Sequence, residues 1–200
     1  MTYNVGIFLF PDIEVLDFAG PYEVFTTASR VLARQNAASA AAFNVFSVAE
    51  TAVPVASRPG LQFIPDALFG QHPDIDLLII PGGVVTAEME KPAVVDWIKA
   101  QASSATITAS VCTGAFLLAQ AGVIRSHKVT THWEDISDLQ RAFPALNVVS
   151  DARWVDEGAV VTSAGISAGI DMSLHLVARL FDMALAERTA RQMEYDWNRG

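Results

Sequence analysis

Cys112, the only cysteine in the chain, stands where the sequence changes from a strand pattern to a helix pattern. The apolar run 105–112 ends at this residue, and a helical pattern over 113–123 follows at once. A nucleophile at such a strand–turn–helix junction projects from the sheet edge, and small neighbouring residues suit that geometry. The amides and dipole of the following helix favour a thiolate, so we expect the pKa of Cys112 to lie below its usual value of about 8.5. The alternative is an inert core thiol.

A glycine pair follows the preceding apolar run, in the sequence IDLLIIPGG. Glycines at such a turn let backbone N–H groups approach a substrate closely. We therefore expect the amides of Gly82, Gly83 and Thr113 to form an anion hole beside Cys112. Thr113 has a simpler alternative role as the first residue of the helix, with its hydroxyl capping locally.

Strand and helix patterns alternate along the chain. The expected strands are 3–10, 41–49, 75–80, 105–112 and 128–133, with a small hairpin at 61–65 and two strands within 147–165 that turn at Asp156-Glu157-Gly158. The expected helices are 14–35, interrupted by a loop or turn at Gly20-Pro21, then 93–102, 113–123, 134–143 and 166–197. This alternation predicts one doubly wound, mostly parallel α/β sheet with helices on both faces, whose ligand crevice lies outside the carboxyl ends of the strands.

The composition limits the class of protein. With 200 residues, 52% of them hydrophobic, the chain fits one medium domain that spans residues 1–200. The net charge is −9 and the 13 lysines and arginines are scattered, so we do not expect this chain to bind nucleic acid. One cysteine excludes an intramolecular disulfide framework and a CxxC zinc site, and no other residues have metal-ligand spacing. The start lacks a basic leader region and no long apolar stretch exists, which predicts a cytoplasmic protein outside the membrane.

Five segments together resemble the DJ-1/PfpI superfamily, namely FPDIEVLDFAGPYEVF, DLLIIPGG, SVCTGAFLLAQAGVI, THW and SAGISAGIDMSLHLVARL. The likeness runs over nearly the whole chain and looks closest to isocyanide hydratases and to the amidase-like N-terminal domains of AraC-type regulators. It implies a flavodoxin-like fold with Cys112 as the reactive residue on a nucleophile elbow. It also implies a homodimer that acts on a small molecule and needs no cofactor or metal.

The resemblance adds three residues to the candidate site. The family holds an acid beside the cysteine sulfur, and the match in LDFAGP carries it to Asp17, for which a helix N-terminal cap is the alternative. A carboxyl desolvated beside a thiolate has a raised pKa, which suits a proton donor. Many members place a histidine near the cysteine at the position of His132, with a structural role as the alternative. Ile166 ends the segment 163–166, where the hydratases are richer in glycine, so added side chains would narrow the pocket. The segment 30–43 is also longer than in those enzymes.

The resemblance carried by these residues implies a hydratase of the isocyanide hydratase type. The Cys112 thiolate would attack the terminal carbon of an isocyanide, Asp17 would protonate that carbon and later help to activate water, and an N-substituted formamide would leave. Thr113 stands where the peptidase-like branch of the superfamily has histidine, which argues against a protease. Two alternatives stay open, a ligand-sensing domain of an AraC-type regulator and a stress protein of the glyoxalase or deglycase type.

Overall fold

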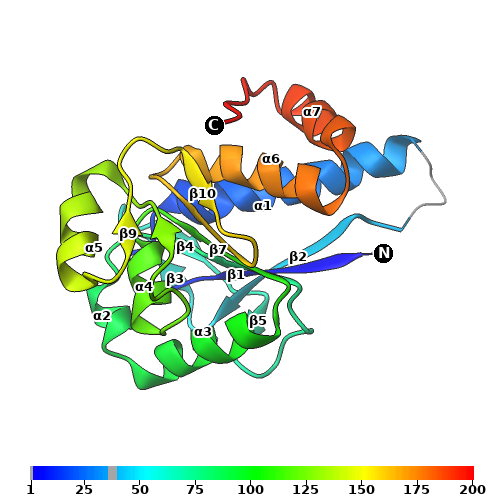
Figure 1. Cartoon of the computed structure of the whole chain (residues 1–200). Helices are drawn as coiled ribbons and strands as arrows, with labels where there is room; N and C mark the ends of the chain where they lie inside the picture. Colours follow the sequence, from blue (N-terminus) through cyan, green and yellow to red (C-terminus); the bar gives the residue numbers. More distant parts are fainter. Residues whose placement is uncertain (1, 36–39) are drawn as a thin grey trace.

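A seven-stranded sheet forms the centre of the computed structural model, which describes residues 2–35 and 40–200 (Figure 1). In spatial order its strands are β10 (Trp154–Asp156), β11 (Val160–Ser163), β7 (Ile107–Val111), β6 (Leu77–Ile80), β1 (Tyr3–Phe8), β2 (Phe43–Ala49) and β5 (Ala67–Leu68). All neighbours run parallel except β10, which is antiparallel to β11. The mostly parallel α/β sheet is as the sequence predicts.

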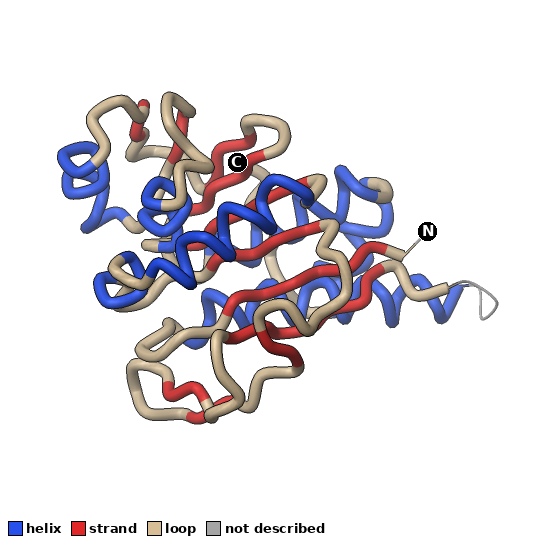
Figure 2. Tube along the Cα trace, turned by 90° about the horizontal axis from the view of Figure 1, so that it is seen from below, coloured by secondary structure: helices blue, strands red, loops and turns tan. Residues whose placement is uncertain are grey.

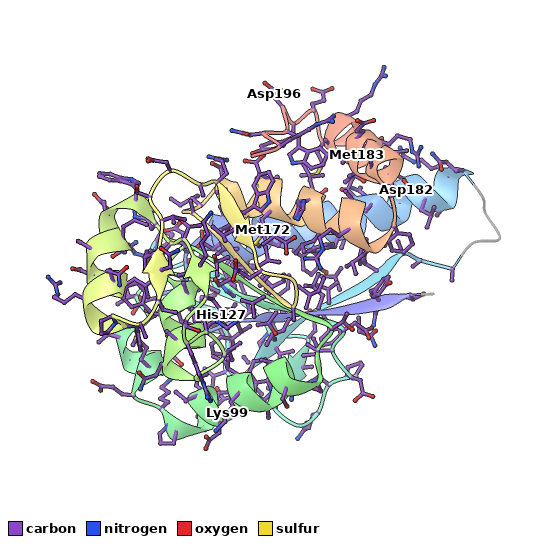
Figure 3. All side chains as sticks on the ribbon, viewed as in Figure 1. Lys99, His127, Met172, Asp182, Met183 and Asp196 are labelled. Atoms are coloured by element: carbon purple, nitrogen blue, oxygen red, sulfur yellow. The ribbon has the colours of Figure 1, made fainter. Side chains whose placement is uncertain are left out.

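Helices cover both faces of this sheet, which is also as predicted. The helices α1 (Val15–Gln35) and α6 (Ala168–Leu180) lie on one face with α7 (Met183–Gln192) packed against both, and α3 (Pro92–Ser104) and α4 (Gly114–Gln120) lie on the other. Figure 2 shows the strands side by side with helices in front and behind, and in Figure 3 Met172 of α6 and Lys99 of α3 lie on opposite sides. Because both faces are covered, central strands such as β6 are buried along their whole length.

The remaining elements are short. The predicted hairpin joins β3 (Val55–Ala56) to β4 (Gln62–Phe63), and the strand predicted at 128–133 is reduced to β8 (Lys128–Val129). The residues expected as one strand before the turn at Asp156 are divided, because β9 (Asn147–Val148) pairs with β8 and the chain then crosses to the main sheet at β10. The helix α2 (Thr86–Met89) and a 3-10 turn (Trp133–Asp135) before α5 (Ile136–Ala142) complete the described elements.

Helix α1 runs through Gly20-Pro21, so the interruption predicted there is wrong. Proline has no N–H for the helical ladder, and in a helix interior it typically costs about 3 kcal/mol. The helix persists because its inner face is buried against the sheet and α6, where Val24 and Phe25 are fully buried. A Cβ on Gly20 would lie 2.9 Å from the Ile170 side chain, so glycine here lets α1 and α6 pack closely.

The helix predicted over 166–197 is two helices, α6 and α7, followed by an irregular end. The division falls at Asp182, whose carboxylate accepts a hydrogen bond from the Leu185 amide at 2.6 Å and so begins a new helix. This cap overrides the continuous apolar pattern. Among the described helices, none has the length and apolar character needed to cross a membrane.

The direction of winding reverses between β1 and β6. Strand β1 pairs with β2 on one side and with β6 on the other, so the chain builds outward first one way and then the opposite way. At such a point the loops at the carboxyl ends diverge and leave a crevice. The loops after β1, β6 and β7 meet there, and they lead to Asp17, the glycine turn and Cys112.

Candidate functional site

Cys112 lies at a sharp junction between β7 and α4. Its φ is 55°, in the left-handed region that residues other than glycine rarely adopt, and 7% of the residue is exposed. Its amide donates to the carbonyls of Ser163 and Ala164, at 3.2 and 3.3 Å, and its carbonyl accepts a hydrogen bond from the Thr131 hydroxyl at 2.8 Å. These contacts hold the strained turn, and the one from Thr131 was not predicted.

Asp17 lies in the first turn of α1 and is fully buried beside Cys112. Its Oδ2 accepts a hydrogen bond from the Gly82 amide at 3.1 Å, while Oδ1 is buried without a hydrogen-bond partner among the described residues. Burial raises the pKa of Asp17 from 3.8 to about 7; the Gly82 amide opposes this rise, the charge of Glu14 adds to it, and the Cys112 thiol and the Ile166 amide oppose it. The helix-cap alternative is wrong, because the side chain bonds to the loop after β6.

The expectation of a lowered pKa at Cys112 is wrong. Burial, and then the negative charge of Asp17, raise the pKa of the thiol to about 12, although the amide and hydroxyl of Thr113 oppose the rise. Helix α4 has only 7 residues, and its dipole does not outweigh these two causes. Ionisation of Asp17 thus disfavours ionisation of Cys112. Between pH values of about 7 and 12 the pair holds a single proton.

The glycine turn after β6 supports Asp17 and Thr113. The Gly82 amide donates to Asp17, and the Gly83 amide donates to the Thr113 hydroxyl at 2.9 Å, which in turn donates to the Gly83 carbonyl at 2.9 Å. Neither glycine amide is free, so the anion hole expected from Gly82 and Gly83 is not present in that form. The Thr113 hydroxyl does not cap α4, so that alternative is also wrong. The Thr113 amide is directed at the Cys112 sulfur.

Gly114, the first residue of α4, sets how closely the cysteine turn packs against β6. A Cβ here would lie 2.1 Å from the Ile80 carbonyl oxygen and 2.8 Å from that of Pro81, and both are backbone atoms. We expect Gly114→Ala to lower the free energy of unfolding by about 1–3 kcal/mol, measured by urea denaturation. Gly20→Ala is the control, because its Cβ would meet a movable isoleucine side chain. Equal stability of the two variants would contradict this packing argument.

His132 and Ile166 both line the cavity that reaches Cys112. The His132 ring packs against Gly165 so closely that a Cβ there would lie 2.1 Å from its Cδ2 atom. The other edge of the ring places Nδ1 3.3 Å from Asp135 Oδ2. Ile166 has a φ of 53°, so a second strained residue faces the cavity.

Two segments, 163–166 and 30–43, are expected from the sequence to differ from the isocyanide hydratases. Within the segment 163–166, Ile166 is the residue that lines the described cavity. That its side chain narrows the pocket relative to the hydratases stays a prediction. Of the segment 30–43, residues 36–39 lie outside the described residues. Its first part ends α1 and its last residue begins β2.

The cavity has a volume of about 650 Å³ and mixes apolar and charged side chains. Its apolar lining includes Val84, Val85, Met89, Phe116 and Ile166. Thr113 lies beside Cys112 in the lining, whereas Asp17 lies behind the cysteine. The apolar residues come from the loop after β6, from α2 and α4, and from the loop before α6, so no local pattern in the sequence identifies them together.

Four carboxylates and two guanidiniums also line this cavity. Its two arginine–carboxylate pairs are Arg58 with Glu14, at 3.6 Å, and Arg141 with Asp138. The other two carboxylates, Glu134 and Asp135, lie beside His132, so the lining carries an excess of negative charge. Such a field disfavours anionic substrates. Over residues 2–35 and 40–200, no group of three or more His, Cys, Asp or Glu side chains could hold a metal ion.

Comparison with known proteins matches the chain to one protein family. Residues 3–179 match the DJ-1/PfpI family. The chain is 36% identical to the isonitrile hydratase of Pseudomonas putida, over 98% of this chain and 79% of that enzyme. It is 26% identical to the HTH-type transcriptional regulator GbdR of Pseudomonas aeruginosa over 96% of this chain, and it spans 51% of that regulator.

Solved structures agree with this match. A THiJ/PfpI family protein from Pseudomonas syringae superimposes with a TM-score of 0.85 and 28% identity, over 99% of this chain and 77% of that one. Drosophila melanogaster DJ-1beta, at 20% identity, shares the fold with a TM-score of 0.82 over 98% of this chain and 100% of that one. The flavodoxin-like architecture is thus shared, and every residue of the candidate site falls within the matched range. The chain belongs to the DJ-1/PfpI family.

Proposed function

We propose that the protein is a cytoplasmic, cysteine-dependent hydratase that adds water to an isocyanide and releases an N-substituted formamide. The observation that carries this proposal is the buried pair of Cys112 and Asp17, in which a carboxyl with a pKa of about 7 lies against the only thiol. Such a pair can move a proton between sulfur and a substrate carbon at neutral pH. The isonitrile hydratase relative, similar over 98% of the chain, supports the same chemistry.

The first half of the reaction adds the thiol across the terminal carbon of R–N≡C. As the C–S bond forms, the proton of Cys112 passes to the Asp17 carboxylate, and Asp17 delivers it to that carbon. The product is a thioimidate, R–N=CH–S–Cys112, in which the triple bond has become a double bond. The Thr113 amide, directed at the sulfur, steadies its developing charge, and Gly82 and Gly83 hold Asp17 and Thr113 in place.

The second half hydrolyses the thioimidate. Asp17 accepts a proton from the attacking water as its oxygen bonds to the carbon, and that proton goes to the substrate nitrogen. The O–H proton of the resulting intermediate then returns to sulfur through Asp17 while the C–S bond breaks and the C=O bond forms. The sum is R–NC plus water giving R–NH–CHO, with Cys112 and Asp17 restored. We propose that His132 and Ile166 contact the R group, and that the excess negative charge of the cavity favours an uncharged substrate.

The direct test is formamide production from one aliphatic and one aromatic isocyanide. We expect turnover of about 1 per second or faster, the ordinary range for enzymes. Turnover of methylglyoxal with no formamide from either isocyanide would contradict the proposal and favour the glyoxalase type.

The pair of Cys112 and Asp17 also predicts the pH profile. In the reactive form the Cys112 thiol holds a proton and Asp17 is a carboxylate, so this form is present above the Asp17 pKa of about 7. As pH falls below that value, Asp17 is protonated as well and the reactive form is lost. We expect kcat/KM to rise about tenfold per pH unit below that value and to level off above it. Measurement from pH 5 to 9 decides this, and a profile that is flat through pH 7 would contradict it.

A ligand-sensing role is the second candidate, because the chain matches GbdR over 96% of its length while spanning half of that regulator. In that case the cavity binds a small molecule without turning it over. Saturable binding of an isocyanide or formamide with no catalysis, in a protein whose Cys112 still reacts quickly with iodoacetamide, would favour the sensor over the hydratase.

We also propose that the protein is a homodimer. Tyr22 of α1 and Ile64 beside the β3–β4 hairpin are exposed, and with the partly buried Phe63 they line a hollow of about 350 Å³. Ile64 is 79% exposed and Tyr22 is 39% exposed, and neighbouring exposed apolar side chains of this kind are typical of a surface that a partner covers. Light scattering at micromolar concentration should give twice the mass of one chain, and Ile64→Glu should give the mass of a single chain.

A further inference from the structure

A second hollow, of about 440 Å³, lies between the C-terminal part of α1 and helix α7. Figure 1 shows α7 beside this end of α1, and in Figure 3 Asp182 and Met183 mark where α7 begins. We call it the arginine groove. Its lining is Val31, Arg34 and Gln35 from α1, and Arg188, Arg191, Gln192 and Glu194 from α7 and the residues after it.

The spacing of these residues explains the groove. On α1 they stand at positions i, i+3 and i+4 from Val31, and on α7 the same spacing starts at Arg188, so each helix turns one continuous face to the other. The Arg34 guanidinium donates to Gln192 Oε1 at 2.7 Å, which joins the two helices across the groove. Val31 is buried and forms an apolar floor. The walls therefore consist mainly of hydrogen-bond donors.

The arginine groove is positively charged, whereas the whole protein has a net negative charge. The protein has 22 acidic residues against 13 basic ones, yet no carboxylate lies within ion-pair distance of Arg34, Arg188 or Arg191 in the part of the chain that the structure describes. Glu194 is the single acidic residue among the described residues of the lining. Three guanidiniums around one hollow repel one another, and an anion between them would relieve that repulsion.

Helix dipoles account for only part of this cluster. Arg34 and Arg191 lie in the last turns of their helices, where a cation is favourable. Arg188 lies earlier in α7, and its Nε is buried with no hydrogen-bond partner among the described residues. A buried charged donor without a partner is unfavourable in a folded protein. The helix dipoles therefore do not explain Arg188, and an anion in the groove would supply the charge partner that its guanidinium lacks among the described residues.

We propose that the arginine groove binds a small molecule through a phosphate group. Guanidinium groups match the geometry of phosphate oxygens with paired N–H donors, and the side-chain amides of Gln35 and Gln192 can add further donors. The groove is separate from the Cys112 cavity, because Asp17 and Arg34 lie about 26 Å apart along α1 at 1.5 Å per residue. The inference does not depend on the proposed hydratase activity.

Thermal unfolding of the whole chain tests the proposal, with pyrophosphate and glucose 6-phosphate as probes and sodium chloride at matched ionic strength as the reference. We expect saturable stabilisation with a Kd below about 1 mM and a rise in Tm of about 5 °C or more at a hundredfold excess over that Kd. Stabilisation by pyrophosphate but not by the ester assigns free phosphates as the ligand, and stabilisation by both assigns phosphate esters as well. The same rise with chloride, or with succinate, would overturn the proposal.

Single charge removals locate the effect. Arg188→Gln and Arg191→Gln should each weaken probe binding at least tenfold. The probe-free Tm should stay or rise in Arg188→Gln, because one of three repelling charges is gone, whereas Arg191→Gln also loses the favourable interaction with the C-terminal end of α7. Arg125→Gln is the matched control, since Arg125 is also outside any described ion pair and, among the described residues, its guanidinium donates only to the Gly122 carbonyl, at 3.0 Å. If Arg188→Gln fails to fold, the loss of probe binding is measured in Arg191→Gln and Arg34→Gln, because these two arginines are exposed. Equal weakening by Arg125→Gln would overturn the proposal.

Discussion

Cys112→Ala should lose hydratase turnover by about four orders of magnitude, to the limit of detection. Without the thiol no thioimidate forms, and the remaining groups can only hold isocyanide and water near each other. The variant should keep its fold, because the cysteine side chain is small and its turn is held by backbone contacts to Ser163 and Ala164 and by Thr131. The measurement is formamide release under saturating isocyanide, alongside circular dichroism and Tm of the same samples.

Cys112→Ser provides the matched control for shape. It keeps the size and the strained backbone but replaces sulfur by a much weaker nucleophile, so it should be as inactive as the alanine variant. Formamide release by either variant at a tenth of the wild-type rate would mean that Cys112 is not the nucleophile.

Asp17→Asn should lose activity and gain stability at the same time. Proton transfer between sulfur and carbon stops, and a fall in kcat of about 10²–10⁴-fold is the usual effect of removing a general acid–base group. The folded-state pKa of about 7 lies above the unfolded value of 3.8. The free energy of unfolding of the wild type therefore falls as pH rises from about 4 to about 7, and it stays lower by this amount above pH 7. The rise in pKa corresponds to roughly 4 kcal/mol at most.

Asparagine carries no charge, so the variant does not lose stability through ionisation of a buried carboxyl. The side-chain oxygen of the introduced asparagine can still accept from the Gly82 amide. Its NH₂ group replaces Oδ1, which has no partner among the described residues, and this costs about 1–3 kcal/mol of the gain. A net gain of about 1–3 kcal/mol, or about 2–10 °C in Tm, is expected at pH 8 and none at pH 4. Urea denaturation at the two pH values measures it.

Asp171→Asn is the control for Asp17→Asn. Asp171 is also fully buried, but it forms an ion pair with Arg153. Removing its charge leaves the guanidinium without a partner, so that variant should lose stability at pH 8. If Asp17→Asn kept full turnover, the proton-transfer role would be wrong; if it were destabilised as Asp171→Asn is, the carboxylate would be structural.

Much of the fold follows from local patterns in the sequence. The apolar runs that became β6 and β7 are continuous because both faces of the sheet are covered, and the glycines and the cysteine that end them are visible without any structure. The errors have tertiary causes. Burial against α6 carries α1 through Pro21, and one capping aspartate, Asp182, divides the last helix despite an unbroken apolar pattern.

The sequence identified the candidate site residues better than it predicted their pKa values and the charges around them. Asp17, His132 and Ile166 could be named only through the family resemblance, since no spacing links them to Cys112. The direction of the thiol pKa was wrong because a dipole is a local property of α4, whereas burial and the charge of Asp17 depend on the assembled fold. The charged lining of the cavity, such as Arg58 beside Glu14, joins distant segments, and nothing in either segment signals it.

The left-handed backbone at Ile166 bears on how this protein could evolve. A β-branched side chain in that conformation costs roughly 1–2 kcal/mol that glycine would not. Because the same side chain lines the cavity, a substitution that shortens it to glycine would both enlarge the space beside Cys112 and relax the backbone. Most substitutions that open a cavity sacrifice stability, whereas this one need not. The range of small molecules that fit the cavity can therefore change through substitution at position 166 without a prior compensating mutation.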